Sequence, residues 1–397
     1  MADITVTNAP ALLFAVAQGQ HGIVWDDSHV VGYFFYTDDQ ATAEVRYVKT
    51  LDGGETWEAS VQLNVGTATN VAFSVWPDWW TRGVSGNLIH FTYYSGNNNR
   101  IIYGALDVSD DSLITEVNIS ASLSDSPTNL GIVKSRGGEL AVIWNSGSAV
   151  ARSDFRISTD GGTTWIDRLD PWNSSLSDPH EVYLFPSDET DENDVWALVQ
   201  DTIADELQFW VYDRSTNTWS SEVIVSSWVT VSGNLGTALT HSTRHLWLIG
   251  ISGNPFGLAA DIRVWEIGGL GEISEKTVVL DSDDYISCNI MVDQNTDDVY
   301  VCYGRGADVS SLIARSKVSL DGGVTWETEV TEGDGTTYVI RRMDVPPGVT
   351  NRGRWLVTWY DQTSDDIFTN TDNAVDLGQA PSGGTSALLQ LQRELLL

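Results

Sequence analysis

The side chains of this sequence that could do chemistry are mostly carboxylates. Asp and Glu number 55 against 21 Lys and Arg, which gives a formal net charge of -34. Two segments space oxygen-bearing side chains closely enough to wrap Ca²⁺, namely 188–194 (DETDEND) and 281–284 (DSDD), although solvated hairpin turns would look the same. The six histidines show no zinc spacing, and there is no phosphate-binding glycine loop or nucleophile elbow. We therefore expect no cofactor, with Ca²⁺ as the open alternative.

The net charge bears on which partners are expected, and the two cysteines bear on whether a disulfide is expected. An acidic surface repels nucleic acid and anionic membranes, so neither is an expected partner. Cys288 and Cys302 fall on consecutive predicted strands. We expect two buried thiols there, with a pair facing each other as the alternative. Residues 1–17 lack the basic start of a signal peptide and no apolar run is long enough to span a bilayer, so we expect neither feature.

One octapeptide, S/T-x-D-G-G-x-T-W, occurs three times, at 50–57, 158–165 and 319–326. Each copy follows a run with strand alternation. The Asp carboxylate can accept hydrogen bonds from the N–H groups that follow it, and Gly supplies the positive φ of a tight turn. The pattern predicts three hairpin turns, with each Trp beginning the next strand. The defining residues are Asp52, Gly54, Trp57, Asp160, Gly162, Trp165, Asp321, Gly323 and Trp326.

The octapeptides resemble the repeat of the Asp-box (BNR-repeat, sialidase-like) β-propellers, a family that includes sialidases, sortilin-type receptors, some glucanases and many phage adhesins. They cover only a small part of the chain. The resemblance implies that each box is a turn between the third and fourth strands of a blade, on the face away from the active site. It implies the architecture strongly and the function weakly.

The chain divides into units of about fifty residues, as four short strands and their turns require. Six units lie at 21–63, 70–119, 129–169, 180–225, 235–280 and 285–331. A remainder at 337–376 offers three strands, and residues 3–7 alternate as a strand without a partner in the first unit. Placing 3–7 as the outer strand of a seventh unit closes the ring. We predict an all-β, seven-bladed propeller over 1–376, with six blades and a loose extension as the alternative.

Residues 377–397 are expected to form a linker and a short amphipathic helix. Leu388, Leu391 and Leu395 would share one face of this helix, and Ser386 could cap it. A helix this short is unstable alone in water. We therefore expect it to dock on its own propeller, or on a protein partner or symmetry mate.

The resemblance implies a ligand face made by the connections between blades and the loops between second and third strands. The candidate ligand-binding residues there are Trp172, Asp178, His180, Trp228, Phe256, Arg305, Asp308 and Asp361. Aromatic rings beside short polar side chains suit sugars, because the rings stack on C–H faces while the polar groups bind hydroxyls. Trp172 and Trp228 could instead pack between blades.

The same residues allow two enzymatic alternatives. A sialidase needs three arginines for the carboxylate of its ligand, a Tyr activated by Glu, and an Asp that acts as acid and base. The Arg-Ile-Pro signature that sialidases carry ahead of the first Asp box is replaced here by HGIVW at 21–25. The predicted ligand loops contain only one arginine, Arg305. Tyr338 with Glu332 could imitate the nucleophile pair, or Tyr338 could be a core residue. Hydrolysis of a neutral glycan could use two of Asp178, Asp201, Asp283, Asp308 and Asp361.

We therefore expect a non-enzymatic binding or structural propeller. The favoured role is a virion-surface or tail-associated protein that binds a glycan or cell-surface receptor, located on a virion or outside the cell. The alternative is a secreted glycoside hydrolase, acting on a neutral glycan rather than as a sialidase.

Overall fold

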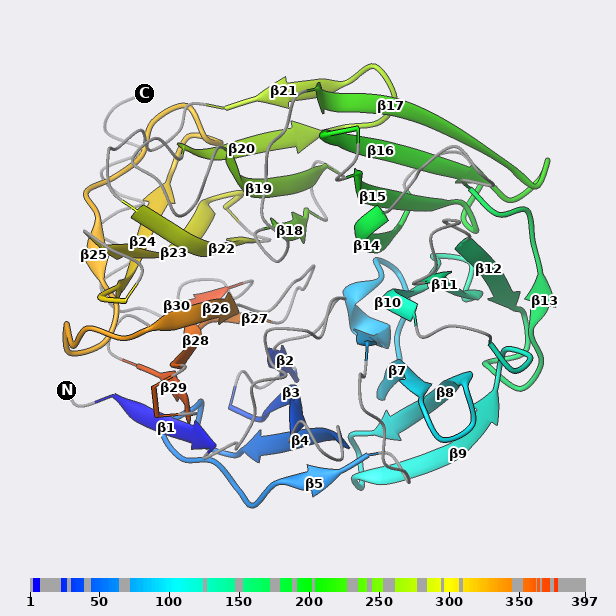
Figure 1. Cartoon of the computed structure of the whole chain (residues 1–397), viewed down its shortest axis with the longest axis horizontal. Helices are drawn as coiled ribbons and strands as arrows, with labels where there is room; N and C mark the ends of the chain where they lie inside the picture. Colours follow the sequence, from blue (N-terminus) through cyan, green and yellow to red (C-terminus); the bar gives the residue numbers. More distant parts are fainter. Residues whose placement is uncertain are drawn as a thin grey trace.

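The computed structural model arranges seven four-stranded sheets in a ring (Figure 1). The residues that it describes are 3–7, 23–26, 30–38, 44–63, 72–123, 127–146, 153–171, 179–187, 191–201, 204–226, 235–240, 245–252, 261–276, 284–293, 296–306, 310–344, 353–361, 363–364, 366–371 and 375–377. The seven-bladed propeller is confirmed, and the six-bladed alternative is wrong. Among the described segments, no helix has the length and hydrophobicity that crossing a bilayer requires.

Six blades take their strands in chain order from the ring's centre outward (Figure 1). Blade one contains β2 (Ile23–Trp25), β3 (Gly32–Asp38), β4 (Glu44–Thr50) and β5 (Val61–Gln62). Blade two contains β6 (Phe73–Pro77), β7 (Leu88–Ser95), β8 (Arg100–Asp107) and β9 (Ser112–Asn118). Blade three contains β10 (Pro127–Lys134), β11 (Leu140–Ser146), β12 (Ser153–Ser158) and β13 (Ile166–Asp167). Blade four contains β14 (Pro179–Pro186), β15 (Val195–Asp201), β16 (Glu206–Asp213) and β17 (Thr218–Ser226). Blade five contains β18 (Leu235–Leu239), β19 (Leu246–Ser252), β20 (Asp261–Ile267) and β21 (Ile273–Glu275). Blade six contains β22 (Asp284–Val292), β23 (Val299–Gly306), β24 (Ile313–Ser319) and β25 (Val330–Thr331). A 3₁₀ turn, η1 (Asp78–Trp80), joins β6 to β7.

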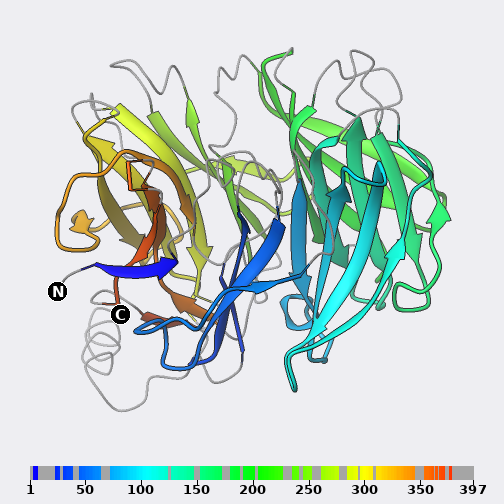
Figure 2. The ribbon, with the colours of Figure 1, turned by 60° about the horizontal axis from the view of Figure 1, so that its bottom comes forward.

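The seventh blade joins the two ends of the chain. Its order is β1 (Ile4–Thr7), β29 (Asp366–Thr369), β28 (Thr358–Asp361) and β26 (Ile340–Asp344), so the N-terminal strand lies outermost, against β29 (Figure 2). Ile4 pairs with Thr369, and the register shifts between Thr5 and Thr7. This closure was predicted from the unpartnered alternation of residues 3–7 and is confirmed. A small extra sheet pairs β27 (Gly353–Trp355) with β30 (Val375–Leu377).

Burial follows the position of a strand in its blade. Every residue of β6 and β15 is buried, because neighbouring blades cover both faces of an inner strand. Outermost strands such as β17 alternate between exposed and half-buried residues. Cys288 and Cys302 are buried free thiols that pack in different clusters, Cys288 beside Trp247 and Cys302 beside Met343. The expectation of two buried thiols is confirmed.

The three octapeptides form one turn with the same hydrogen bonds. In the first copy, Thr50 Oγ1 accepts the Gly54 N–H at 2.9 Å, and Asp52 Oδ1 accepts the Thr56 N–H at 2.8 Å. Gly53 and Gly54 both have positive φ, at 73° and 96°. One detail of the prediction is wrong: the Trp precedes the fourth strand rather than beginning it, since β5 starts at Val61 and β25 at Val330.

The second glycine of each octapeptide lies directly against the preceding blade. A Cβ added there would come within 2.7, 2.0 and 2.9 Å of a side chain in blades seven, two and five respectively. The three contacts are Gly54 with Leu356, Gly162 with Tyr103 and Gly323 with Lys276. The Asp turns therefore join consecutive blades, and glycine is required for the close approach as well as for its backbone conformation.

Candidate functional site

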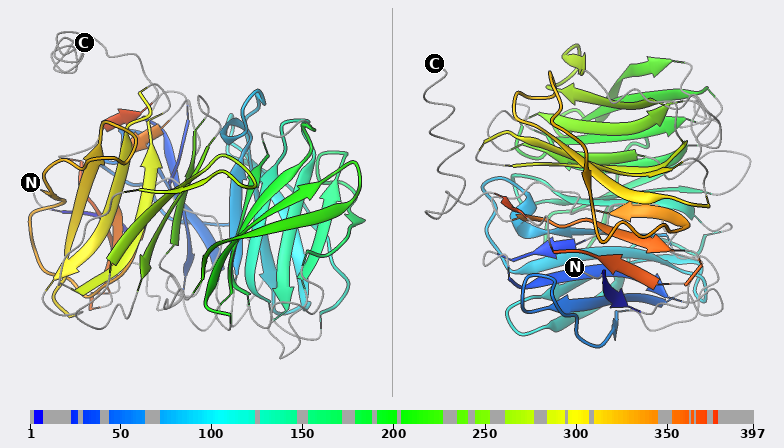
Figure 3. Two further views of the ribbon diagram at one scale, coloured as in Figure 1. Left: turned by 90° about the horizontal axis from the view of Figure 1, so that it is seen from above. Right: turned by 90° about the vertical axis from the view of Figure 1, so that its left-hand side faces the viewer.

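The strand order gives the ring two distinct faces. Because successive strands of a blade run antiparallel, the first-to-second connections and the Asp turns emerge on one face, which we call the Asp-turn face. The second-to-third loops and the blade-to-blade connections emerge on the other, which we call the connection face. The β27–β30 pair and η1 lie on the same side of the ring when it is viewed edge-on (Figure 3).

Most of the predicted ligand-binding residues lie outside the described part of the chain. These are Trp172, Asp178, Trp228, Phe256 and Asp308. His180 lies in β14, where only the backbone is described. Arg305 and Asp361 can therefore be placed, and all eight residues stay predictions.

Arg305 is the penultimate residue of β23, at the connection face, and is already paired. Its Nη1 lies 2.9 Å from both carboxylate oxygens of Glu329. Tyr303 donates its hydroxyl hydrogen to Glu329 Oε2 at 2.7 Å, and Arg315 Nε lies 3.7 Å from Oε1. An anionic ligand would have to compete with Glu329 for this guanidinium.

Two of the candidate catalytic carboxylates support loops of the connection face. Asp361 is 4% exposed and accepts the Val339 N–H at 2.8 Å and the Ser364 N–H at 2.9 Å. Asp201 is 2% exposed and accepts the Ala204 N–H at 3.0 Å. These contacts suit residues that shape turns at the ends of β28 and β15. The other three candidates, Asp178, Asp283 and Asp308, lie outside the described residues.

The sialidase-like pair of Tyr338 and Glu332 does not form. Tyr338 donates its hydroxyl hydrogen to Asp3 and packs against the rings of Trp359 and Phe368, with centroids 5.8 and 5.2 Å away. Glu332 accepts a hydrogen bond from Ser316 instead. Tyr338 is thus the packed tyrosine of the alternative interpretation, and its hydroxyl helps to close the ring.

A buried polar network, which sequence reasoning missed, links blades two and three. His90 Nε2 lies 2.9 Å from Asp78 Oδ1, and its Nδ1 lies 2.8 Å from the Tyr103 hydroxyl. Lys134 of β10 also pairs with Asp78. Burial lowers the pKa of His90 despite the opposing charge of Asp78. His90 and Asp78 are 1% and 2% exposed, so no substrate can reach this histidine and the network is structural.

Three carboxylates of blade three lie close enough to hold a hard cation. Asp154, Asp167 and Asp170 each have an oxygen within 4.8 Å of the others. Burial and the charges of Asp154 and Asp167 raise the pKa of Asp170 to about 6. In the predicted calcium segments, 188–190 and 281–283 lie outside the described residues. Asp191 and Asp194 accept backbone N–H groups at 2.9 and 2.7 Å.

Replacing Asp170 by asparagine is expected to stabilise the protein in a pH-dependent way. Because the folded pKa of about 6 exceeds the reference value of 3.8, ionised Asp170 opposes folding. This penalty is absent below about pH 3.8 and complete above about pH 6. Asp170→Asn keeps the acceptor for the Phe155 N–H, now at 3.1 Å, and should add about 1 kcal/mol near neutral pH after allowance for solvent screening. Urea unfolding at about pH 7.5 and pH 3.5 tests this, and an equal gain at both pH values would contradict it.

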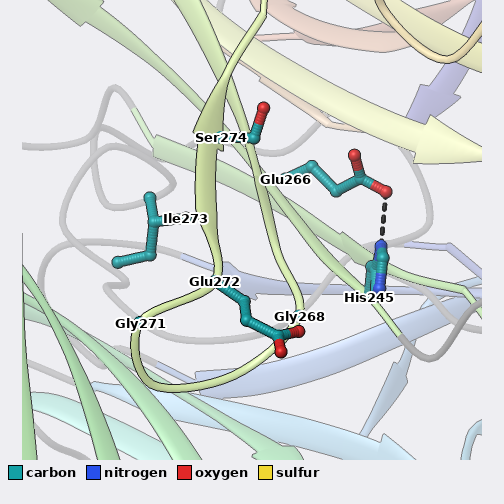
Figure 4. Close-up of a pocket in the computed structure, with 7 residues that line it drawn as sticks. All are labelled: His245, Glu266, Gly268, Gly271, Glu272, Ile273 and Ser274. Carbon is teal, nitrogen blue, oxygen red and sulfur yellow. Dashed lines mark hydrogen bonds and ion pairs between the residues drawn. The ribbon is translucent and has the colours of Figure 1, made fainter.

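A pocket of about 250 Å³ opens on blade five, where 268–271 (GGLG) replaces an Asp turn (Figure 4). It is lined by His245, Glu266, Gly268, Gly271, Glu272, Ile273 and Ser274. His245 directly precedes β19, and Glu266 lies near the end of β20. Their side chains face each other and are paired (Figure 4). This site could not be predicted from the sequence, because His241 and His245 match no metal-ligand spacing.

No protein-family model and no curated protein matches this chain. Its fold is similar to that of an ulvan lyase described as bound to -[GlcA(1-4)Rha3S]-, with 13% identity, 93% of this chain and 94% of that one covered, and a TM-score of 0.53. A protein of unknown function from Dyadobacter fermentans is 12% identical to this chain. The comparison covers 80% of this chain and 97% of that protein, with a TM-score of 0.54. AofleA from Arthrobotrys oligospora is 11% identical to this chain. The comparison covers 84% of this chain and 95% of AofleA, with a TM-score of 0.51. At these identities the likeness extends to the fold alone, so the chemistry has to be argued from this chain's own residues.

Proposed function

We propose that this protein is a non-enzymatic member of the Asp-box propellers that binds glycans through its connection face. The observation that carries the proposal is that the candidate catalytic and anion-binding side chains on the described part of that face are paired or buried. Arg305 is paired with Glu329, while Asp201 and Asp361 are buried and hold turns. A catalytic acid or base needs contact with substrate, and these side chains are engaged in support instead.

The charge of the chain favours a neutral glycan. The ulvan lyase with a similar fold is described with a saccharide that contains glucuronate and sulfated rhamnose. A net charge of -34 opposes binding of such an anion, and Arg305 already has a carboxylate partner. Neutral sugars can be held by stacking on Trp172, Trp228 and Phe256, whose rings the sequence assigns to this face.

We further propose that the predicted tail, residues 377–397, attaches the propeller, residues 1–376, to a larger assembly such as a virion surface. Leu377 ends β30, and the predicted helix lies outside the described residues. The described chain ends at Leu377 in β30, beside β27, on the side of the ring that carries η1 (Figure 3). A tail that leaves from the Asp-turn side would let the connection face point outward. Leu388, Leu391 and Leu395 would contact the protein partner or symmetry mate.

A glycan array probed with the full chain, combined with a panel of fluorogenic glycosides, tests the function. We expect binding of a neutral glycan without turnover, and about tenfold weaker binding by Trp228→Ala. Leu51→Ala, at a side chain that is 53% exposed on an Asp turn, should bind like the original protein. A chain lacking 385–397 should keep glycan binding and lose assembly in light scattering.

Two results would contradict the proposal. Glycoside turnover that disappears on replacing one of Asp178, Asp283 or Asp308 would establish the hydrolase instead. Unchanged assembly after removal of 385–397 would exclude the attachment role of the tail without affecting the glycan-binding role.

A further inference from the structure

The pocket of blade five holds a histidine whose orientation is fixed by two neighbours (Figure 4). His245 Nδ1 pairs with Glu266 Oε1, and Lys276 Nζ lies 2.5 Å from Glu266 Oε2. Lys276 is itself held 5.5 Å over the ring of Trp247. A carboxylate oxygen accepts, so His245 donates from Nδ1 to Glu266, and Nε2 is the ring nitrogen left to bind a metal ion when the imidazole is neutral.

Glu272 supplies a second ligand-type atom in the same pocket. The position that a Cβ on Gly268 would take is 3.1 Å from His245 Nε2 and 2.8 Å from Glu272 Oε2. Neither atom has a hydrogen-bond partner within the described part of the chain. Glu272 is exposed, and the side chain of His245 is 34% exposed, so both can be reached from solvent. His245, Gly268 and Glu272 all line this pocket, and glycine places no Cβ against the two atoms.

We propose that His245 and Glu272 bind a divalent transition-metal ion of the Zn²⁺ type, with water completing its coordination. Metal-bound histidines commonly donate their other ring N–H to a carboxylate, and Glu266 stands in that position. Imidazole nitrogen favours Zn²⁺, Ni²⁺ and Cu²⁺ over Ca²⁺ and Mg²⁺, which separates this site from clusters of carboxylates alone. The strongly acidic surface concentrates cations near it.

This site is independent of glycan binding. It lies at the turn between β20 and β21, on the Asp-turn face, whereas the glycan is assigned to the connection face. The GGLG segment there lacks the Asp and Thr of the octapeptide, so the loop is free of the hydrogen bonds that define an Asp turn. The same loop places Gly268 and Glu272 around the histidine.

Calorimetric titration of the full chain with Zn²⁺ in excess Ca²⁺ tests the proposal. Excess Ca²⁺ would compete for any site made of carboxylates alone, such as the cluster of Asp154, Asp167 and Asp170. We expect a single Zn²⁺ to bind in its presence. Glu272→Gln should weaken this binding at least about tenfold, because it removes a ligand. Gly268→Ala should do the same, because its methyl group would lie 2.8 Å from Glu272 Oε2 and 3.1 Å from His245 Nε2 and so displace both atoms.

Glu275→Gln is the matched control. It changes the net charge as Glu272→Gln does, but Glu275 pairs with Arg263 at 3.4 Å outside the pocket. This variant should bind Zn²⁺ like the original chain, and thermal melting without metal should give all three variants similar stabilities. Zn²⁺ binding that survives both Glu272→Gln and Gly268→Ala, or that excess Ca²⁺ abolishes, would overturn the proposal.

Discussion

Replacing Gly162 by alanine is expected to destabilise the propeller by about 4 kcal/mol. A Cβ at this position would lie 2.0 Å from Cε1 of Tyr103 in blade two, and the backbone φ of +94° already disfavours any side chain. Tyr103 cannot easily move, because its hydroxyl lies 2.8 Å from His90 Nδ1 and its ring packs 5.2 Å from that of Trp165. Urea unfolding followed by tryptophan fluorescence measures the loss.

The neighbouring Gly161 provides the control for this prediction. Its φ is +71°, but an added Cβ would meet nothing within 4 Å. Gly161→Ala should therefore cost only the backbone strain of a left-handed residue, about 1 kcal/mol. Equal losses in the two variants would mean that backbone conformation, and not contact between blades, explains the second glycine of the Asp turn.

Removal of residues 1–7 is expected to cost at least about 5 kcal/mol or to prevent folding. The deletion takes away the outer strand of blade seven, and with it Val6, which is 4% exposed. It also removes Asp3, which accepts the Asp334 N–H at 2.9 Å and the Tyr338 hydroxyl hydrogen. The exposed edge of β29 would then be free to pair with other molecules.

The measurement is the unfolding free energy together with the oligomeric state in light scattering. A chain lacking only residues 1–2, which precede β1, should match the full chain in both. If the chain without 1–7 also unfolds like the full chain and stays unaggregated, then β1 does not close the ring in solution.

The fold could be predicted because its signals are local. The Asp carboxylate and the two glycines of each octapeptide specify one turn, and the resemblance to the Asp-box repeat, together with units of about fifty residues, implies the ring. The closing strand was found from the alternation of Ile4 and Val6 and the missing fourth strand of the last unit. The exact start of each outer strand was missed, because the Trp packs against the neighbouring blade before ladder pairing begins.

The buried network of blades two and three and the pocket of blade five could be predicted less well, because the residues that form them are distant in sequence. Asp78 lies 12 residues from His90 and 56 from Lys134, and only the packing of two blades brings the three together. Glu266 lies 21 residues from His245, and no ligand motif has that spacing. Arg305 was predicted in a loop but lies within β23, and its pairing with Glu329 depends on a bridge across strand β24 that the sequence does not reveal.

Hydrogen–deuterium exchange with the neutral glycan that binds best on the array is the most direct test of the central claim, that the Asp turns support the ring and the connection face binds. The account predicts slower exchange on glycan addition in connection-face segments such as 226–234, and no change in the Asp turns at 50–57, 158–165 and 319–326. Protection of those three turns, with unchanged exchange at the connection face, would contradict it.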